Sequence, residues 1–276
     1  MSFGAIFGAT ALIGAVGLLI GVFLTAAGKK FAVEVDEREV AVREALPGNN
    51  CGGCGYPGCD GLAEAIAKGE AAVDACPVGG SEVGNIIAGI MGQAGRESVR
   101  MAAFVKCSGT CDRVKNLYDY TGIQDCEMAS LLPGAGIKAC SYGCLGFGSC
   151  VKVCKFDAIH IVNGVAVIDR EACKDCGMCI LKCPRHLIEL LPYDQGAVVA
   201  CNSKARGKEV MNVCTVGCIG CKKCERTCPQ KAIRVDDNLP RIYASLCVGC
   251  GECAKACPRH IIQVKASGEA EIKISA

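Results

Sequence analysis

The sequence predicts an α+β protein with one N-terminal transmembrane helix, a small helical domain that carries four cysteines, and two tandem cysteine-rich modules. Three observations support this prediction: an uncharged N-terminal run, 25 cysteines among 276 residues, and a repeat of cysteine positions in the C-terminal half. The predicted parts are an anchor at 1–28, a juxtamembrane helix and linker at 29–48, a four-cysteine domain at 49–100, a first module at 101–200, a second module at 201–265 and a tail at 266–276.

The composition argues against several classes of protein. A formal net charge of +2 provides no basic surface for nucleic acid, and 5% aromatic residues leave few platforms on which bases could stack. A chain of 276 residues is too long for a miniprotein held together by disulfides. We therefore expect no nucleic-acid partner, and the spacing of the cysteines must indicate their role.

The first predicted element is a membrane anchor. Residues 3–27 carry no charged side chain, and at about 1.5 Å per residue they span roughly 37 Å, enough to cross the hydrocarbon core. A signal peptide would begin with a positive region, which is missing, and a buried core helix is the alternative. Lys29 and Lys30 follow at once, and the positive-inside rule assigns that end to the cytoplasm. We expect a single-pass protein of the inner membrane whose soluble part faces the reducing cytoplasm, where disulfides are rare.

Three helices are predicted after the anchor. The first begins at a capping-type sequence from Asp36 and ends before Pro47; the second covers 61–69, and the third covers 81–92 with apolar residues on one face. Between them lies the first cysteine group: Cys51, Cys54, Cys59 and Cys76.

An internal repeat begins at residue 140, and each of its cysteines recurs at one constant interval further along the chain. The two copies comprise Cys140, Cys144, Cys150, Cys154, Cys173, Cys176, Cys179 and Cys183, and then Cys214, Cys218, Cys224, Cys228, Cys247, Cys250, Cys253 and Cys257. Upstream, Cys107 matches Cys201 with a different gap. Between the cysteine groups of the first copy, apolar runs flank Asn163-Gly164 and predict a β-hairpin. A looser version, with 236–240 as its loop, is predicted in the second copy.

The second copy contains the bacterial ferredoxin pattern twice, because each C-x2-C-x2-C run ends in C-x3-C-P. In this pattern the first three cysteines bind one [4Fe–4S] cluster and the fourth binds the other. One predicted cluster is therefore bound by Cys218, Cys221, Cys224 and Cys257, and its neighbour by Cys247, Cys250, Cys253 and Cys228. Paired zinc sites lack the third cysteine and the prolines, so zinc is the weaker alternative.

The first copy lacks one ligand. Cys173, Cys176, Cys179 and Cys154 complete one cluster, but Phe147 replaces the next expected cysteine. Cys144, Cys150 and Cys183 then need a fourth thiolate. Cys111 or Cys126 could supply it, and a cluster with three cysteine ligands is the alternative.

Two further clusters are predicted from the remaining cysteines. Cys107, Cys140, Cys201 and Cys214 occupy equivalent positions in the two copies and could bridge them, although they could also be small buried residues. The N-terminal group has the ligand count of one more cluster, with structural zinc as its alternative. The total is six [4Fe–4S] clusters, or five on a conservative count, with Cys111 or Cys126 left unassigned.

The anchor, the Cys51-Gly-Gly-Cys54-Gly-Tyr-Pro-Gly-Cys59 element and the modules resemble RnfB, the iron–sulfur subunit of the Rnf ion-translocating electron transport complex, in its long form. The resemblance implies an electron-transfer subunit of a ferredoxin:NAD⁺ oxidoreductase that exchanges electrons with soluble ferredoxin. It also implies partner subunits: flavin-carrying membrane subunits and an NAD-binding subunit, coupled to Na⁺ or H⁺ movement.

The residues outside the cysteine groups predict no catalytic site. The run 134–139 superficially matches a dinucleotide fingerprint, but cysteines replace the helix that should follow it. His160, His186 and His260 are expected to be structural or solvent-facing. The alternative functions are a relay in another membrane complex, such as a hydrogenase or a redox-sensor reductase, and a zinc-bound scaffold without a redox role.

Overall fold

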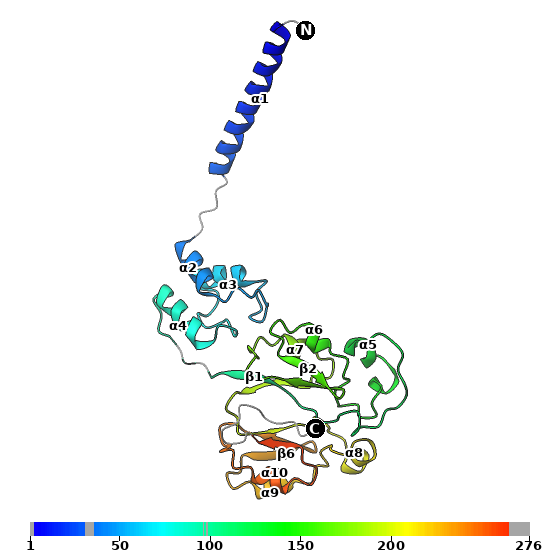
Figure 1. Cartoon of the computed structure of the whole chain (residues 1–276). Helices are drawn as coiled ribbons and strands as arrows, with labels where there is room; N and C mark the ends of the chain where they lie inside the picture. Colours follow the sequence, from blue (N-terminus) through cyan, green and yellow to red (C-terminus); the bar gives the residue numbers. More distant parts are fainter. Residues whose placement is uncertain (1–2, 31–35, 96, 98, 265–276) are drawn as a thin grey trace.

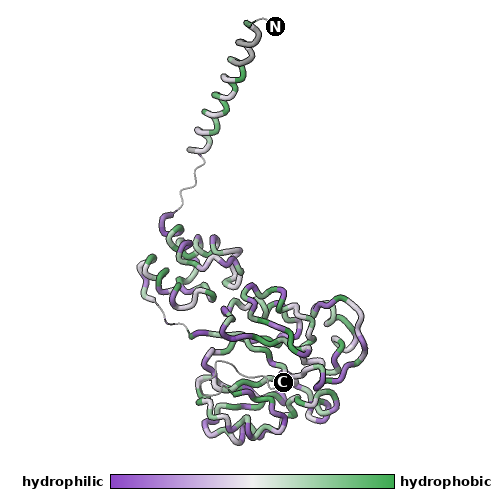
Figure 2. The backbone as a smooth tube through the Cα atoms, viewed as in Figure 1, coloured by the Kyte–Doolittle hydropathy of each residue, from purple (hydrophilic) through white to green (hydrophobic). Residues whose placement is uncertain are grey.

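The structure is a computed structural model, and it describes residues 3–30, 36–95, 97 and 99–264. Helix α1 (Phe3–Lys30) stands apart from the other elements (Figure 1). Its segment Ala11–Gly28 is long and apolar enough to cross a membrane, and none of it is buried. Figure 2 colours this stretch apolar or neutral. The predicted apolar N-terminal helix is therefore confirmed, and the alternative of a buried core helix does not fit its exposed side chains.

Three helices form the N-terminal domain: α2 (Glu37–Ala45), α3 (Cys59–Ala67) and α4 (Gly80–Met91). The Asp36 carboxylate accepts a 2.9 Å hydrogen bond from the Arg38 N–H and caps α2, as the sequence predicts. The core between the helices is apolar and includes Val42, Leu62 and Ile87, each at most 1% exposed. The three predicted helices are thus confirmed, with shifts of one or two residues at their starts.

The cysteine loop explains why helix α3 starts earlier than the sequence predicts. This helix begins at Cys59, two residues before the predicted position. The side-chain oxygen of Asn50 accepts a 2.8 Å hydrogen bond from the Cys59 N–H, which is one of the donors that a helix start leaves without a partner. The cysteine loop itself therefore supplies the cap of the next helix.

The first module comprises β1 (Met101–Val105), α5 (Cys126–Ser130), a short 3-10 helix η1 (Pro133–Ala135), α6 (Ser149–Lys152), β2 (Ile159–Val162), β3 (Val165–Ile168), α7 (Met178–Lys182) and β4 (Ile188–Pro192). The second module comprises β5 (Ala197–Val199), α8 (Gly207–Val213), α9 (Lys223–Thr227), β6 (Ile233–Asp236), β7 (Leu239–Ile242), α10 (Glu252–Ala256) and β8 (Ile262–Val264). The α+β class is confirmed, and the predicted tail lies outside the described residues.

Each module contains two antiparallel strand pairs. The inner pairs are the two hairpins, β2–β3 and β6–β7. The outer pairs, β1–β4 and β5–β8, join the first strand of each module to the strand after its last cysteine. Val105 pairs with Ile188 and Val199 pairs with Ile262, so the copies correspond across these pairs as well. The sequence predicts the hairpins but not the outer pairs.

The second hairpin is tighter than predicted. The sequence predicts a loop at 236–240, whereas β6 and β7 are joined by a two-residue turn. Its residues Asp237 and Asn238 have φ of +47° and +61°, similar to Asn163 and Gly164 in the first copy. Asp and Asn adopt this left-handed conformation more readily than most residues, which lets them replace an Asn-Gly pair here.

The two copies stack on each other (Figure 1). Phe104 of the first packs against Val198 and Ala200 of the second in a small buried cluster. Val114 and Cys214 form an isolated antiparallel bridge, flanked by a 2.8 Å hydrogen bond from the Thr215 N–H to the Arg113 carbonyl. The modules are therefore joined by both apolar packing and backbone hydrogen bonds.

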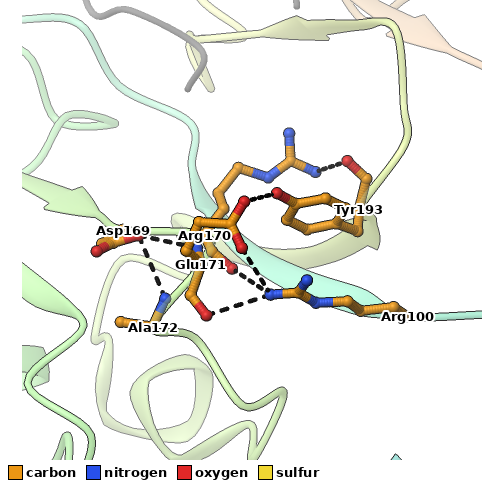
Figure 3. A network of polar contacts seen from close by, with 6 residues as sticks. All are labelled: Arg100, Asp169, Arg170, Glu171, Ala172 and Tyr193. Carbon is orange, nitrogen blue, oxygen red and sulfur yellow. Dashed lines mark hydrogen bonds and ion pairs between the residues drawn. The ribbon is translucent and has the colours of Figure 1, made fainter. Parts of the chain in front are cut away.

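A polar network fixes the loop that leads into Cys173 (Figure 3). Buried Arg170 donates 2.9 Å hydrogen bonds to the carbonyls of Pro192 and Tyr193 at the end of β4. Arg100, just before β1, donates to the Arg170 carbonyl at 3.3 Å, and its guanidinium lies 4.0 Å from the centre of the Tyr193 ring. Burial lowers the pKa of Arg170. The loop is thus attached to both strands of the outer pair.

Candidate metal centres

The predicted groups divide 24 of the 25 cysteines into six candidate sites of four, and Cys111 is the one left out. Site 1 is Cys51, Cys54, Cys59 and Cys76; site 2 is Cys154, Cys173, Cys176 and Cys179; site 3 is Cys126, Cys144, Cys150 and Cys183; site 4 is Cys107, Cys140, Cys201 and Cys214; site 5 is Cys218, Cys221, Cys224 and Cys257; and site 6 is Cys228, Cys247, Cys250 and Cys253.

Sites 5 and 6 lie in the second copy as its double cysteine pattern predicts. The four cysteines of site 5 line one cavity, and those of site 6 line another. Cys224 and Cys253 come from the short helices α9 and α10, which lie against each other. Cys228 and Cys257 follow these helices directly, so each helix carries a ligand for one site and leads into a ligand for the other.

The structure indicates which cysteine is the fourth one at site 3, where Phe147 replaces the expected ligand. Cys126, Cys144, Cys150 and Cys183 line one cavity, whereas Cys111 is exposed and lines none of the four cysteine cavities. Cys126 is the first residue of α5, which the Asp125 carboxylate caps. Its N–H donates a 2.8 Å hydrogen bond to the Ser149 hydroxyl beside Cys150. Of the two candidates, the structure brings Cys126 to the site.

An insertion in the first copy delivers Cys126. The chain between Cys107 and Cys140 is much longer than the equivalent chain between Cys201 and Cys214, and the additional residues include α5 and η1. The ring centre of Phe147, which replaces the expected ligand, lies 5.4 Å from the ring centre of Tyr120 in this insertion. Phe147 also packs against the group of buried apolar side chains that includes Cys126. The residue that removes a ligand thus helps to hold the segment that supplies another.

Site 4 joins the two copies. Its cysteines line one cavity, two from each copy. Burial raises the pKa of Cys140 and Cys201, and the thiols of Cys214 and Cys107 from the opposite copy add to this rise. Gly143 and Gly217 hold equivalent places beside them. A Cβ at Gly143 would stand 3.4 Å from the Cys140 sulfur. Glycine therefore allows the backbone to pass close to the sulfurs, as a tightly enclosed cluster requires.

The four thiols of site 2, and three of the four at site 1, lie close enough together to affect the pKa of one member, whereas Cys51 is assigned to site 1 by its place in the sequence. At site 2, burial raises the pKa of Cys179 to about 12, and the nearby thiols of Cys173, Cys176 and Cys154 add to this rise. At site 1, burial raises the pKa of Cys76, and the nearby thiols of Cys54 and Cys59 add to it. Cys51 begins the same loop, three residues before Cys54, and its thiol adds to the rise that burial causes in the pKa of Cys176 at site 2.

The donor sets fit cubane clusters. In the described part of the chain, no group of three or more cysteine, histidine, aspartate or glutamate side chains is arranged to hold a single metal ion. Four of the quartets instead surround a cavity, as thiolates around a compact iron–sulfur core do, while zinc draws its ligands to about 2.3 Å from one point. Burial raises the pKa of Cys150 and Cys224 to about 12, so these thiols need a metal to become thiolates.

Backbone amides point at the sulfurs in the same way in both copies. The Cys144 N–H donates to the Cys107 sulfur at 3.3 Å, and the Cys218 N–H donates to the Cys201 sulfur at 3.4 Å. At site 2, the Ala103 N–H of β1 donates to the Cys173 sulfur at 3.4 Å. Such hydrogen bonds stabilise negative charge on sulfur and influence the reduction potential of a cluster.

The sites are connected in series. The loop of site 1 meets site 2 where Gly53 closely approaches the Cys176 backbone, and Lys155 donates a 2.8 Å hydrogen bond to the Asn50 carbonyl across the same contact. Helices α6 and α7, together with Cys154 and Cys183 within two residues of their ends, contribute ligands to both site 2 and site 3. The amide–sulfur bonds of Cys144 and Cys218 link sites 3 and 5 to site 4, and the alternating cysteines of α9 and α10 link site 5 to site 6.

Sequence reasoning missed three basic residues near the sites. Arg185 and Arg259, at equivalent positions after Cys-Pro, donate to the carbonyls of Cys140 and Cys214 at 3.2 and 2.7 Å. They connect sites 3 and 5 to site 4, and their repeat in the sequence could have identified them. Lys138 is buried beside site 4 and has no counterpart in the second copy that would have revealed it.

The remaining predicted features lie apart from the sites. His160, His186 and His260 are all exposed, which agrees with the solvent-facing alternative of the role expected for them. In the run 134–139, η1 ends at Ala135 and no helix follows until Ser149. The dinucleotide interpretation therefore lacks the strand and helix that it needs.

The sequence matches three known domain families, all of iron–sulfur type. Residues 46–78 match a family described as an Fe-S cluster, residues 166–189 a 4Fe-4S binding domain, and residues 217–261 a 4Fe-4S dicluster domain. The fold and the sites thus define a protein with an apolar N-terminal helix and several iron–sulfur domains of ferredoxin type.

Three relatives specify the family, and each is the B component of an ion-translocating complex. The chain is 43% identical to that of the Na⁺-translocating ferredoxin:NAD⁺ oxidoreductase complex of Acetobacterium woodii, over 84% of this chain and 69% of that protein. It is 40% identical to that of the ion-translocating oxidoreductase complex of Methanosarcina acetivorans, over 84% and 88%. It is 39% identical to that of the proton-translocating ferredoxin:NAD⁺ oxidoreductase complex of Clostridium ljungdahlii, over 84% and 82%. The chain belongs to the RnfB family of ion-translocating Rnf complexes, and the predicted resemblance is confirmed.

Proposed function

We propose that this chain binds six [4Fe–4S] clusters, one at each site, and relays electrons between soluble ferredoxin and the flavin-carrying and NAD-binding subunits of its Rnf complex. The observation that carries the proposal is the unbroken series of contacts that runs from site 1, through sites 2 to 5, to site 6. Every step from one site to the next is made by a ligand, a neighbour of a ligand or a helix that carries ligands. Bound clusters supply one-electron chemistry, and the chain's own residues hold the thiolates, exclude water and donate N–H groups to sulfur.

The two ends of the series differ in a way that supports a direction for the relay. Site 1 belongs to the domain next to the anchor, which brings it toward the membrane subunits. Site 6 lies at the other end, and Cys250 is the one exposed cysteine among those of the six sites. Leu246 and Val248 beside it are exposed apolar residues, which suits a transient protein contact. Site 6 is therefore the proposed contact for ferredoxin, and site 1 the proposed contact for the membrane subunits.

The anchor is proposed to hold the soluble part on the cytoplasmic side of the inner membrane. Lys30 at the end of α1 supports this orientation. The test uses spheroplasts and inverted vesicles that contain the full complex, with an added protease. Cleavage between residues 36 and 264 in inverted vesicles alone supports the proposal, and cleavage in spheroplasts contradicts it.

The cluster count is tested by iron analysis of the intact protein, purified without oxygen. Six clusters give about 24 iron atoms per chain, and about 20 would remove one site from the proposal. A colourless protein that contains zinc would contradict the whole proposal. The partners are tested by affinity purification of the membrane-bound chain: recovery of flavin-carrying and NAD-binding subunits supports the relay, and recovery of a hydrogenase contradicts it.

A further inference from the structure

Lys138 is a buried cation with neutral partners. It is 2% exposed, and its ammonium donates hydrogen bonds of 3.1 and 2.8 Å to the carbonyls of Gly109 and Gly164. None of the ion pairs between described residues includes it. A buried charge is costly unless an opposite charge compensates it. Within the described part of the chain, the atoms around Lys138 therefore leave its charge without a counterion.

The position of Lys138 indicates where the counterion comes from. The residue lines the cavity of site 4 and donates to Gly109, whose N–H donates to the Cys107 sulfur at 3.4 Å. Burial raises the pKa of Cys107 of site 4 and Cys144 of site 3, and the nearby Lys138 charge opposes that rise at both. The Cys144 N–H also donates to the Cys107 sulfur, so the ligand loops of the two sites touch beside the ammonium. A [4Fe–4S] core with four thiolates carries about −2 when oxidised and gains one more negative charge on reduction.

We propose that Lys138 holds a fixed positive charge between sites 3 and 4, which compensates both clusters and makes both easier to reduce. This inference rests on the proposed function, because it requires clusters at those two sites. A nearby positive charge stabilises the more negative, reduced form of a cluster, and burial keeps that interaction strong.

The effect is confined to the first copy. Position 212, the equivalent of 138 in the repeat, is Asn212, which is exposed on α8. Site 5 therefore stands opposite site 3 across site 4 without a matching buried cation. The series is asymmetric as a result: an electron that leaves site 5 moves toward the two clusters that Lys138 favours.

The test is a redox titration of the intact protein, followed by electron paramagnetic resonance, with Lys138→Gln as the main variant. At a fixed poise, the reduced-to-oxidised ratio of two of the six clusters should fall at least tenfold, which is a shift of about 59 mV for a one-electron couple. Lys138→Arg, which keeps the charge, should restore most of the ratio. Lys152→Gln is the matched control, since Lys152 lies between Cys150 and Cys154 but is 61% exposed and lies near Asp125. It should leave all six ratios unchanged.

A second variant tests the charge without replacing the lysine. A Cβ at Gly164 would stand 3.6 Å from the Lys138 ammonium and 3.9 Å from Cys111 Cβ, so both side chains lie next to Gly164. Cys111→Asp thus places a carboxylate near the ammonium at an exposed position outside the six sites. It should lower the same two ratios in the same direction, and Cys111→Ser should not.

The outcomes separate the two proposals. If Lys138→Gln retains its iron and the reduced-to-oxidised ratios do not change, the role of Lys138 is overturned. If Lys138→Gln loses iron, unchanged ratios in Cys111→Asp overturn it instead. A wild-type protein that lacks iron at site 3 or 4 contradicts the six-cluster function instead. The shifting transitions are assigned by repeating the titration in a Cys126→Ser background, where site 3 is lost and one shifting transition should remain.

Discussion

Gly53 controls how closely sites 1 and 2 approach, and Gly53→Ala tests this contact. A Cβ at Gly53 would stand 3.0 Å from both the carbonyl carbon and Cα of Cys176, and closer still to its carbonyl oxygen. Ordinary van der Waals contact begins at 3.4 Å, so the two loops must move apart to admit the methyl group. The neighbouring atoms belong to the backbone and cannot rotate away.

The free energy needed to move the two loops apart can be compared with the hydrogen bonds that hold the loops together. Overpacking of this kind costs about 1–3 kcal/mol. Lys155 donates two hydrogen bonds across the contact, to the carbonyls of Asn50 and Asn49, at 2.8 and 3.4 Å. A hydrogen bond to a charged group contributes about 1.5–3 kcal/mol, less at an exposed site. The two amounts are similar, so the variant should shift the N-terminal domain away from site 2 without unfolding it.

The assay measures cluster content and cluster coupling separately. Gly53→Ala should retain about 24 iron atoms, while the magnetic coupling between the reduced clusters of sites 1 and 2 weakens and electron transfer between them slows. Gly89→Ala is the control: it lies on α4 of the same domain, and its Cβ would meet nothing within 4 Å. Wild-type coupling and transfer in Gly53→Ala would refute the reasoning, as would equal losses in Gly89→Ala.

Three further predictions follow from the packing of the sites. Cys126→Ser should lower the iron content from about 24 to about 20 atoms, while Cys111→Ser leaves it unchanged. Adding Phe147→Cys to Cys126→Ser should restore the iron content, because position 147 corresponds to Cys221. If the iron content does not recover, the insertion supplies more than a ligand. Arg170→Ala should lower the free energy of unfolding by about 1–3 kcal/mol, since two carbonyls lose their buried donor, and denaturant titration against a Lys208→Ala control measures it. Leu62→Ala should lower the stability of the N-terminal domain by about 2–5 kcal/mol, and a smaller change in its thermal unfolding would mean that the core refills the cavity.

The ligand groups of the second copy could be predicted because their chemistry is local. Cysteines at C-x2-C-x2-C spacing wrap one cluster over a few residues, so Cys218, Cys221 and Cys224 come together whatever the rest of the chain does. The crossover of Cys228 and Cys257 follows from the repeat. The hairpin at Asn163-Gly164 is local in the same sense, because two left-handed residues suffice to reverse the chain.

The rest depends on contacts between distant parts of the chain. Met101 pairs with Pro192 from the other end of the first module, and no periodicity in β1 or β4 identifies its partner. The choice between Cys111 and Cys126 is set by how the insertion of the first copy folds over Phe147, for which the second copy offers no template. The burial of Lys138 depends equally on two distant carbonyls, at Gly109 and Gly164.

The ligand spans have a consequence for synthesis of the protein on the ribosome. All ligands of sites 1, 2 and 3 precede residue 184, so these sites can be filled while the second copy is still being made. Site 4 takes ligands from Cys107 to Cys214 and cannot be completed until the first part of the second copy has emerged and docked. Site 4 can therefore bind its cluster only after both copies have folded and docked. A nascent chain truncated before residue 214 lacks this connection between the two copies.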